Sequence, residues 1–242
     1  MRHIPRIHVT APLCKGQQVV LSPTDLHHLL TVLRIPEKAE IRLFNAVSGE
    51  WRAHLMDKKR GMLECIECLL PSVPTASGTD LGPFPHLLFP LLKSARLTYL
   101  LEKSVELGVG ALYPIITEHT MVASFNTERW QVVIKQATEQ CGRLLMPLVH
   151  APKKLESALA AWPREISLFV GDERPAAPPI APFLKKMPSK TAFLVGPEGG
   201  FSVREFATFD RLSFITCVSL GSTVLRTETA TSALLALYAA FH

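Results

Sequence analysis

Two glycine-rich stretches near the end of the sequence carry the residues best suited to bind a ligand. The first is LVGPEGGFS, residues 194–202, and the second is VSLGSTVLRTETA, residues 218–230. Each begins as a short apolar strand and breaks into glycine-rich backbone, and the second runs straight into a helix. Because glycine allows a ligand to approach the backbone closely, we expect the two loops to face one pocket.

The second loop adds charge to this pocket. Arg226 precedes Thr227, which is placed to cap the last helix, so a cation and the positive end of a helix point at the same space. This combination is typical of an anion site, either for a phosphate or for an ionised base. Glu228, in the first helical turn, could instead hold Arg226 in a structural ion pair. Neither Gly-Lys-Ser/Thr nor G-x-G-x-x-G occurs in the loops, which disfavours phosphate binding by those routes.

Strands and helices alternate from residue 86 onward, which predicts an α/β domain with a largely parallel sheet. Ser202 and Glu205 form a capping-box pattern at the start of one of these helices. The last helix is apolar nearly all round, which predicts burial in a core or at a subunit interface. The expected strands are 86–92, 111–119, 166–173, 191–200 and 215–221, and the expected helices are 93–108, 128–141, 203–212 and 227–241, with Thr127 as the cap of the second.

The N-terminal part, residues 1–72, is predicted to be a small β-barrel or sandwich with one helix. Three extended runs between residues 41 and 70 are separated by the turn sequences NAVSG and DKKRG. A short amphipathic helix is expected from the N-cap Ser22 and Pro23 up to Pro36. Residues 73–85 are rich in Pro, Gly, Ser and Thr and predict a linker, so the second domain is 86–242.

The charge balance is compatible with an anionic partner. The formal net charge is +5 and the isoelectric point is near 9.0, which suits a nucleic acid partner but is also ordinary for a soluble protein. Basic side chains on one face would neutralise backbone phosphates, although each could equally be a solvated surface residue. The candidates for RNA contact are Arg2, Arg6, Arg34, Lys93 and Arg96.

Several classes of protein are disfavoured by the sequence. The first residues lack the apolar core of a signal peptide, and no stretch reaches about 18 apolar residues, so a cytoplasmic protein without a membrane span is expected. Five scattered cysteines do not describe a disulfide framework. Cys65 and Cys68 form a C-x-x-C within an apolar strand, which favours core cysteines over a metal or redox site. We therefore expect no metal.

Five segments together carry a resemblance to a known family. They are HHLLTVLR, EKSVELGV, TEQCGR, GPEGGFS and LRTETA, which follow one another over nearly the whole chain. In this respect the sequence resembles the bacterial 16S rRNA uridine-N3 methyltransferase family (RsmE type) of the SPOUT class. The resemblance implies a PUA-like RNA-binding β-barrel and an α/β domain whose C-terminal chain forms a trefoil knot. It also implies a homodimer that binds S-adenosylmethionine (SAM) in the knot and methylates N3 of a specific uridine in 16S rRNA of the small ribosomal subunit.

The resemblance also assigns roles to residues. Arg226 would stabilise the uracil anion, Glu228 would act as a base or orienter, and Arg143 is a second candidate for holding an anion. Where relatives often carry an arginine after a Thr-Glu pair, this sequence has His119, which could weaken a contact or make it pH-sensitive. The implied cofactor contacts are Leu194, Gly196, Pro197, Glu198, Gly199, Ser219, Leu220, Gly221, Val224, Leu225 and Arg226.

Two other hypotheses stay open beside the SAM-dependent rRNA methyltransferase. One is a non-catalytic RNA-binding or ribosome-assembly protein that kept the fold, against which the intact GPEGG and LRTETA stretches argue. The other is an enzyme that places a different adenine-containing ligand in the same pocket.

Overall fold

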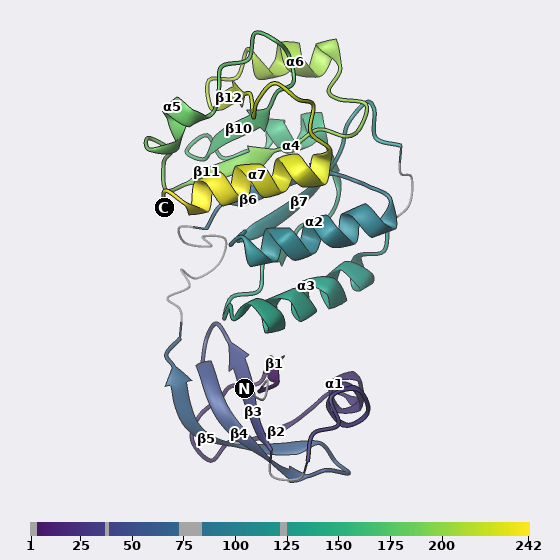
Figure 1. Ribbon diagram of the computed structural model, residues 1–242, viewed down its shortest axis with the longest axis vertical. Helices are drawn as coiled ribbons and strands as arrows, with labels where there is room; N and C mark the ends of the chain where they lie inside the picture. The colour runs from purple at the N-terminus through teal and green to yellow at the C-terminus, as the bar shows by residue number, and fades with distance from the viewer. Residues whose placement is uncertain (1–3, 37–38, 73–83, 122–124) are drawn as a thin grey trace. The chain divides into compact units, whose positions relative to one another are not determined.

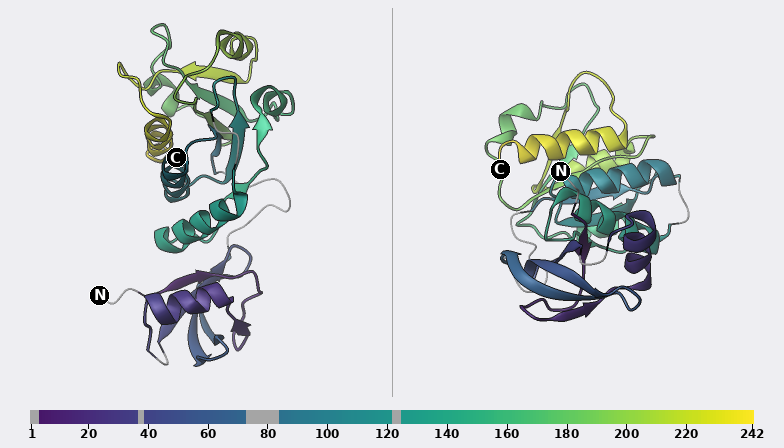
Figure 2. Two further views of the ribbon diagram at one scale, coloured as in Figure 1. Left: turned by 90° about the vertical axis from the view of Figure 1, so that its right-hand side faces the viewer. Right: turned by 60° about the horizontal axis from the view of Figure 1, so that its bottom comes forward.

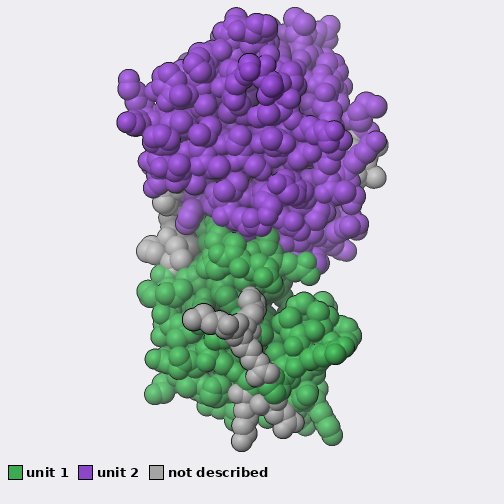
Figure 3. All heavy atoms as spheres, in the orientation of Figure 1, with its two compact units in different colours: residues 1–80, 135–146 green, residues 81–134, 147–242 purple. Residues whose placement is uncertain are grey.

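The computed structural model of the chain describes residues 4–36, 39–72, 84–121 and 125–242. The chain divides into two compact units (Figure 3). Unit 1 comprises Met1–Asp80 and Lys135–Met146, and unit 2 comprises Leu81–Ile134 and Pro147–His242. The predicted domains place residues 135–146 in the second domain, whereas in the structure these residues belong to unit 1. The expected linker falls mainly on residues 73–83, which lie outside the described residues.

Unit 1 contains a five-stranded sheet in the order β1-β3-β4-β5-β2. The three predicted runs are confirmed as the antiparallel strands β3, β4 and β5, whereas β1, parallel to β3, and β2 were not foreseen. Among the described residues the order has two ends, so the sheet is a half-barrel, and the predicted small β-barrel is not confirmed. The strands are β1 (Arg6–His8), β2 (Gln18–Val20), β3 (Glu40–Asn45), β4 (Gly49–Asp57) and β5 (Met62–Leu70).

The predicted helix of unit 1 begins where expected and then widens. Helix α1 (Pro23–His27) starts at Ser22, whose hydroxyl oxygen accepts the backbone N–H of Asp25, and a π-helical turn follows at His28–Val32. Cys65 lies in the core of this unit, where burial raises the pKa of its thiol to about 11. The core interpretation is therefore confirmed for Cys65, but Cys68 on the same strand is exposed.

The last part of helix α3 (Thr127–Cys141) is held in unit 1 by Arg6. The guanidinium of Arg6 donates to the Glu50 carboxylate at 2.7 and 2.9 Å. It also donates to the carbonyl oxygens of Thr138, Glu139 and Arg143 at 3.0 to 3.2 Å. These carbonyls lie at and just beyond the helix end, where the backbone has no partners of its own. Arg6 thereby fixes residues 135–146 to the sheet of unit 1.

Unit 2 contains a parallel sheet in the order β12-β10-β11-β6-β7-β8, with β9 also paired to β7. The predicted largely parallel sheet is confirmed, because each of these pairings is parallel. The two-residue strands β8 and β9 were not foreseen, since they are too short to show a pattern. The strands are β6 (His86–Pro90), β7 (Ala111–Ile116), β8 (Leu148–Val149), β9 (Lys153–Lys154), β10 (Ser167–Gly171), β11 (Thr191–Leu194) and β12 (Ile215–Val218).

Helices cover both faces of this sheet. Figures 1 and 2 show α2 (Ser94–Glu106) and α7 (Thr227–Ala239) side by side on one face, with α4 (Leu155–Ala160) on the other. Successive residues of β11 alternate between the faces: Phe193 contacts Tyr238 of α7, while Leu194 packs into the core that α4 shares with α6 (Val203–Phe209). Helices α4 and α5 (Ala181–Leu184) were not predicted.

Of the predicted caps of α6 and α3, the first is confirmed and the second is wrong. The capping box of Ser202 and Glu205 is confirmed, with both reciprocal bonds present. At α3, however, the side chain of Asn126 accepts the N–H of Arg129, so the cap is Asn126 and not Thr127. None of the described helices combines the length and apolar character that a bilayer crossing requires.

Candidate functional site

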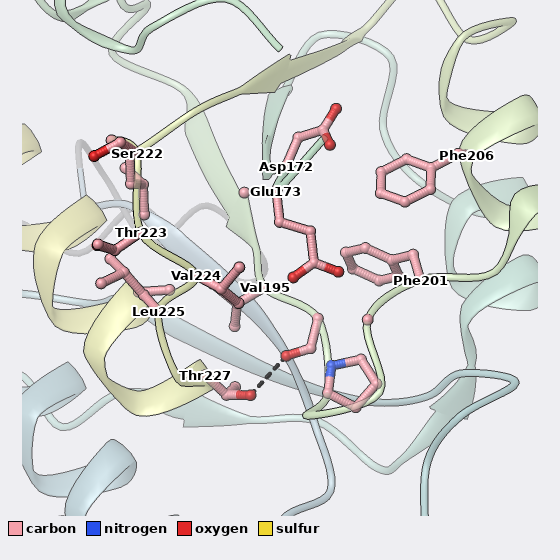
Figure 4. A pocket seen from close by; sticks show the side chains of 17 residues that line it. Asp172, Glu173, Val195, Phe201, Phe206, Ser222, Thr223, Val224, Leu225 and Thr227 are labelled. Carbon is pink, nitrogen blue, oxygen red and sulfur yellow. Dashed lines mark hydrogen bonds between the residues drawn. The ribbon is translucent and has the colours of Figure 1, made fainter. Parts of the chain in front are cut away.

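A cavity opens where β10, β11 and β12 end (Figure 4). The strands are parallel, so their carboxyl ends share one edge of the sheet, the edge at which ligands of open α/β sheets bind. The two glycine-rich loops do face one cavity, as predicted, and the end of β10 supplies a third wall. The lining residues are Gly171, Asp172, Glu173, Val195, Gly196, Pro197, Gly200, Phe201, Phe206, Leu220, Gly221, Ser222, Thr223, Val224, Leu225, Thr227 and Ala230.

A hydrogen bond joins the two predicted loops. The hydroxyl of Thr227 donates to the carbonyl oxygen of Gly196 at 2.7 Å, the bond drawn in Figure 4. Thr227 was expected to cap α7, but the N-cap position is occupied by Arg226, and Thr227 is the first helical residue. Its hydroxyl therefore satisfies a carbonyl of the other loop instead of an N–H of its own helix.

Glycine is favoured at two positions of the first loop. Gly200 has φ of +67°, a backbone conformation that residues with a side chain rarely adopt. At Gly196, a Cβ atom would lie 3.1 Å from the ring of Phe201. Both glycines line the cavity. A side chain would strain the backbone at Gly200 and press on the Phe201 ring at Gly196.

The charge in the cavity is negative. Among its lining residues in the described part of the chain, the charged side chains are Asp172 and Glu173. Asp172 is buried, and Arg174 binds it with two nitrogens at 2.8 to 3.1 Å. This bonding raises the pKa of Arg174, whose guanidinium also lies 3.9 Å from the centre of the Phe206 ring. The anion site expected from the sequence is therefore not what the cavity itself offers.

The expected cofactor contacts divide into two groups. Six of them line the cavity: Gly196, Pro197, Leu220, Gly221, Val224 and Leu225. Leu194 is fully buried in the core, because it ends a strand covered on both faces. The side chain of Ser219 bonds to its own loop at Gly221. Three further residues also lie outside the lining: Glu198, Gly199 and Arg226.

Sequence reasoning missed the third wall of the cavity, Gly171, Asp172 and Glu173. The pattern predicts that the whole segment ISLFVGDE is a strand, whereas β10 ends at Gly171. A signal was present, because two consecutive acidic residues after an apolar run mark a strand end at the ligand-binding edge. Phe201, Phe206, Ser222 and Thr223 gave no comparable signal, since aromatic and hydroxyl side chains are common in loops and cores.

Arg96 connects two carboxylates beside the cavity. Its Nη1 lies 2.5 Å from Oε1 of Glu198, and its Nε lies 3.9 Å from Oε1 of Glu228. Glu198 therefore turns toward α2 and away from the lining. The other oxygen of Glu228, Oε2, is buried and accepts no hydrogen bond within the described ranges. Arg96 thereby links the loop after β11 to the first turn of α7, and its contact with RNA stays a prediction.

Arg226 is exposed at the start of α7, next to Leu225 of the cavity. The alternative ion pair between Arg226 and Glu228 is not formed, since Glu228 is paired with Arg96. In the part of the chain that the structure describes, no carboxylate pairs with the Arg226 guanidinium. The side chain is therefore available to an anionic partner.

His119 supports the first loop from outside the cavity. Its Nδ1 lies 2.9 Å from the carbonyl oxygen of Gly199 and 3.1 Å from that of Gly200. Carbonyl oxygens only accept hydrogen bonds, so Nδ1 carries the proton. A Cβ atom on Gly199 would lie 3.1 Å from the Cβ of His119, so Gly199 faces His119 and does not line the cavity.

The predicted RNA contacts have different environments. Arg6 is 11% exposed, and its five N–H donors are all taken within unit 1, so the structure corrects its assignment to phosphate contact. Arg34 is exposed, with φ of 49°, and Lys93 is exposed at the N-cap of α2. Their contact with RNA stays a prediction. Arg2 lies outside the described residues.

Lys93 lines a groove between α2 and α3, within unit 2. Arg129 adds a second exposed cation to this groove, and Phe125 adds an aromatic side chain that is 47% exposed. The ring of Phe125 lies 5.9 Å from that of the buried Trp130.

Arg143, the other candidate for holding an anion, belongs to unit 1, where burial lowers the pKa of its guanidinium. Its catalytic role stays a prediction.

Comparison with known proteins gives consistent matches. The RNA methyltransferase domain family matches residues 83–239. Ribosomal RNA small subunit methyltransferase E of Synechocystis is 30% identical over 90% of this chain and 71% of its own length. The structure of the protein of that name from Neisseria gonorrhoeae, bound to S-adenosyl methionine, is 31% identical, with a TM-score of 0.82 over 97% of this chain and 96% of that one. A putative methyltransferase from Legionella pneumophila, in complex with SAM, is 29% identical with a TM-score of 0.83 over 98% of both chains. The chain thus belongs to the RNA methyltransferase domain family, together with the ribosomal RNA small subunit methyltransferase E proteins.

Proposed function

We propose that this protein is a SAM-dependent methyltransferase that acts on 16S rRNA of the small ribosomal subunit, at N3 of a uridine. The observation that carries the proposal is the cavity at the ends of β10, β11 and β12, which is built from both glycine-rich loops. Two structures that resemble this chain over nearly their whole length hold SAM.

The residues present fit SAM better than a phosphate-bearing adenine ligand. Val195, Phe201, Val224 and Leu225 offer apolar contact for a flat base, and Gly196 leaves the backbone close to it. SAM carries a positive sulfonium and a positive ammonium group, which suit a cavity whose charged side chains are acidic. A ligand with several phosphates would meet repulsion there.

Methyl transfer to uracil N3 requires two contributions from the protein. Bound SAM supplies an activated methyl group, so the chain must chiefly position the acceptor nitrogen and exclude water. Uracil N3 must also lose its proton before it attacks. The unpaired guanidinium of Arg226 would stabilise the resulting anion, and the buried Oε2 of Glu228 would accept the proton.

The groove between α2 and α3 is suited to the RNA strand. Lys93 and Arg129 would contact phosphates, and the exposed ring of Phe125 would stack on an unpaired base. The target uridine must leave its stack to reach the methyl group.

Family membership supports three further parts of the proposal. We expect the N-terminal unit to be PUA-like and the C-terminal chain of unit 2 to form a trefoil knot. We also expect a homodimer, and its interface to include the outer face of α2 and α7, where Tyr99 is 47% exposed. An rRNA substrate would place the enzyme in the cytoplasm.

The test has two stages. Calorimetric titration should show SAM binding, and its absence at sub-millimolar SAM would remove the proposal. Transfer of radiolabelled methyl should then be measured on small ribosomal subunits from cells that lack this protein, and on the deproteinised rRNA. Nucleoside digestion should yield N3-methyluridine. Methyl on a carbon, a ribose or another base would contradict the N3 assignment, and SAM binding without transfer to either substrate would indicate a non-catalytic RNA-binding protein.

A further inference from the structure

Glu173 directs a free carboxylate into the cavity. Figure 4 shows its side chain pointing toward Phe201 and Val195, in the middle of the space, whereas the carboxylate of the neighbouring Asp172 points away from them. Glu173 follows β10 by two residues, so the strand end fixes its backbone: the Asp172 N–H donates to the carbonyl of Val218 on β12 at 2.9 Å.

The two acidic residues of this wall differ in their partners. Asp172 is neutralised by Arg174, whose backbone N–H also donates to Oδ1 of Asp172 at 2.9 Å. Arg174 is held there a second time by Asp210, at 3.5 Å. Within the described residues, Glu173 forms neither an ion pair nor a hydrogen bond. Of the two carboxylates in the described lining of the cavity, the Glu173 carboxylate is therefore the one whose charge is not balanced by a cation.

The loop after β11 leaves space for this carboxylate. A Cβ atom on Gly200 would lie 2.5 Å from Oε1 of Glu173, closer than two such atoms can approach. Val195 and Phe201, which are buried and apolar, surround the same position and offer it no hydrogen-bond donor from their side chains. Glu173 itself is exposed, so its carboxylate stays in contact with solvent and attracts a cation that is bound directly beside it.

We infer that Glu173 recognises the positive charge of the bound methyl donor, either its sulfonium or its ammonium group. This inference rests on the proposed function and adds a specificity-determining residue to it. Its consequence is that the enzyme distinguishes charged adenosine derivatives from neutral ones that have the same base and sugar.

The test compares three ligands that share adenosine and differ in charge. SAM has the sulfonium and the ammonium group, S-adenosylhomocysteine has only the ammonium group, and 5′-methylthioadenosine has neither. Each is titrated calorimetrically into the wild-type protein, into Glu173→Gln, and into Glu165→Gln. The last variant removes the same charge from an exposed residue that does not line the cavity.

Glu173→Gln should raise the dissociation constant of SAM by roughly 10- to 100-fold, because a charge-assisted contact is lost. The dissociation constant of 5′-methylthioadenosine should change by less than about twofold. A loss for SAM alone would assign Glu173 to the sulfonium, and a loss for SAM and S-adenosylhomocysteine would assign it to the ammonium group. Equal losses for all three ligands, or no loss, would overturn the inference and leave the proposed function standing. Wild-type protein that binds none of the three would overturn both.

Discussion

The hydroxyl of Thr227 and the carbonyl oxygen of Gly196, 31 positions apart in the chain, share a hydrogen bond of 2.7 Å. This bond holds the first turn of α7 against the loop that follows β11. Both residues line the cavity, so the bond sets the distance between two of its walls.

Replacement of Thr227 by valine should loosen the cavity. Valine keeps the shape of threonine but leaves the part-buried Gly196 carbonyl without its donor, which costs about 1 kcal/mol. We expect a lower free energy of unfolding and weaker SAM binding, measured by urea denaturation and calorimetry. Thr227→Ser retains the hydroxyl and should behave nearly as the wild type. Equal effects of the two substitutions would show that the methyl group, not the bond, matters.

Arg226→Ala should lower turnover more than cofactor affinity. The guanidinium is exposed beside the cavity but does not line it, so SAM binding has little need of it. Loss of a group that stabilises a developing anion typically lowers kcat by about 100- to 1000-fold. Methyl transfer at saturating rRNA gives kcat, and calorimetry gives the SAM dissociation constant. Arg226→Lys keeps the charge and should recover part of the rate. Parallel losses in rate and affinity would mean that Arg226 mainly shapes the pocket.

Arg96→Ala should lower the rate of methyl transfer without lowering the stability of the fold. Arg96 is 36% exposed and Glu198 is 44% exposed, so their ion pair should contribute no more than about 1 kcal/mol to folding. Glu228 is only 14% exposed and would lose its cation. We expect kcat to fall about tenfold or more while the unfolding midpoint and the KM for SAM change little. Arg96→Lys is the matched control. An unchanged kcat would remove Arg96 as a positioning residue for Glu228.

His119→Ala should weaken SAM binding by about two- to tenfold, since the Gly199 and Gly200 carbonyls lose their shared donor and the loop gains freedom. His119→Asn supplies an amide N–H and should restore most of the affinity. The effect should appear in the KM for SAM and not in the KM for rRNA. A larger effect on rRNA would show that His119 meets the substrate directly.

Arg6→Met should destabilise unit 1. Glu50 is 2% exposed and pairs closely with Arg6. Among the described residues, removing this cation leaves the buried charge with only the more distant Arg42, at a cost of about 3–5 kcal/mol. Urea denaturation should show this loss, and Arg6→Met combined with Glu50→Gln should recover part of it. Arg60→Met, at a side chain that is 82% exposed, is the control and should change stability by less than about 0.5 kcal/mol.

The elements that position the site were largely predictable, because their signals are local. An apolar run followed by glycine marks the ends of β11 and β12, and the Ser202 capping box fixes the start of α6. What could not be predicted depends on partners far away in the sequence. Thr227 reads as a helix cap until Gly196 is placed beside it, and Arg96 reads as a surface cation until Glu198 and Glu228 are placed around it.

The sign of the charge at the site also depends on residues that are far apart in the sequence. Arg226 at a helix start predicts an anion site, and the structure places this cation exposed at the start of α7. The cavity is lined by the two acidic residues that follow β10, about 50 positions earlier in the sequence. Local sequence could not show that one site would present a negative interior and a positive rim.

Helix α3 has a consequence for how the protein forms during synthesis. Its first residues, up to Ile134, belong to unit 2, and those from Lys135 onward belong to unit 1, where Arg6 holds them. Domains usually fold in the order in which they leave the ribosome. Here the N-terminal unit cannot finish until β6, α2 and β7 of the second unit have already been made. Folding of the two units is therefore interleaved, and neither half of the gene encodes a complete unit.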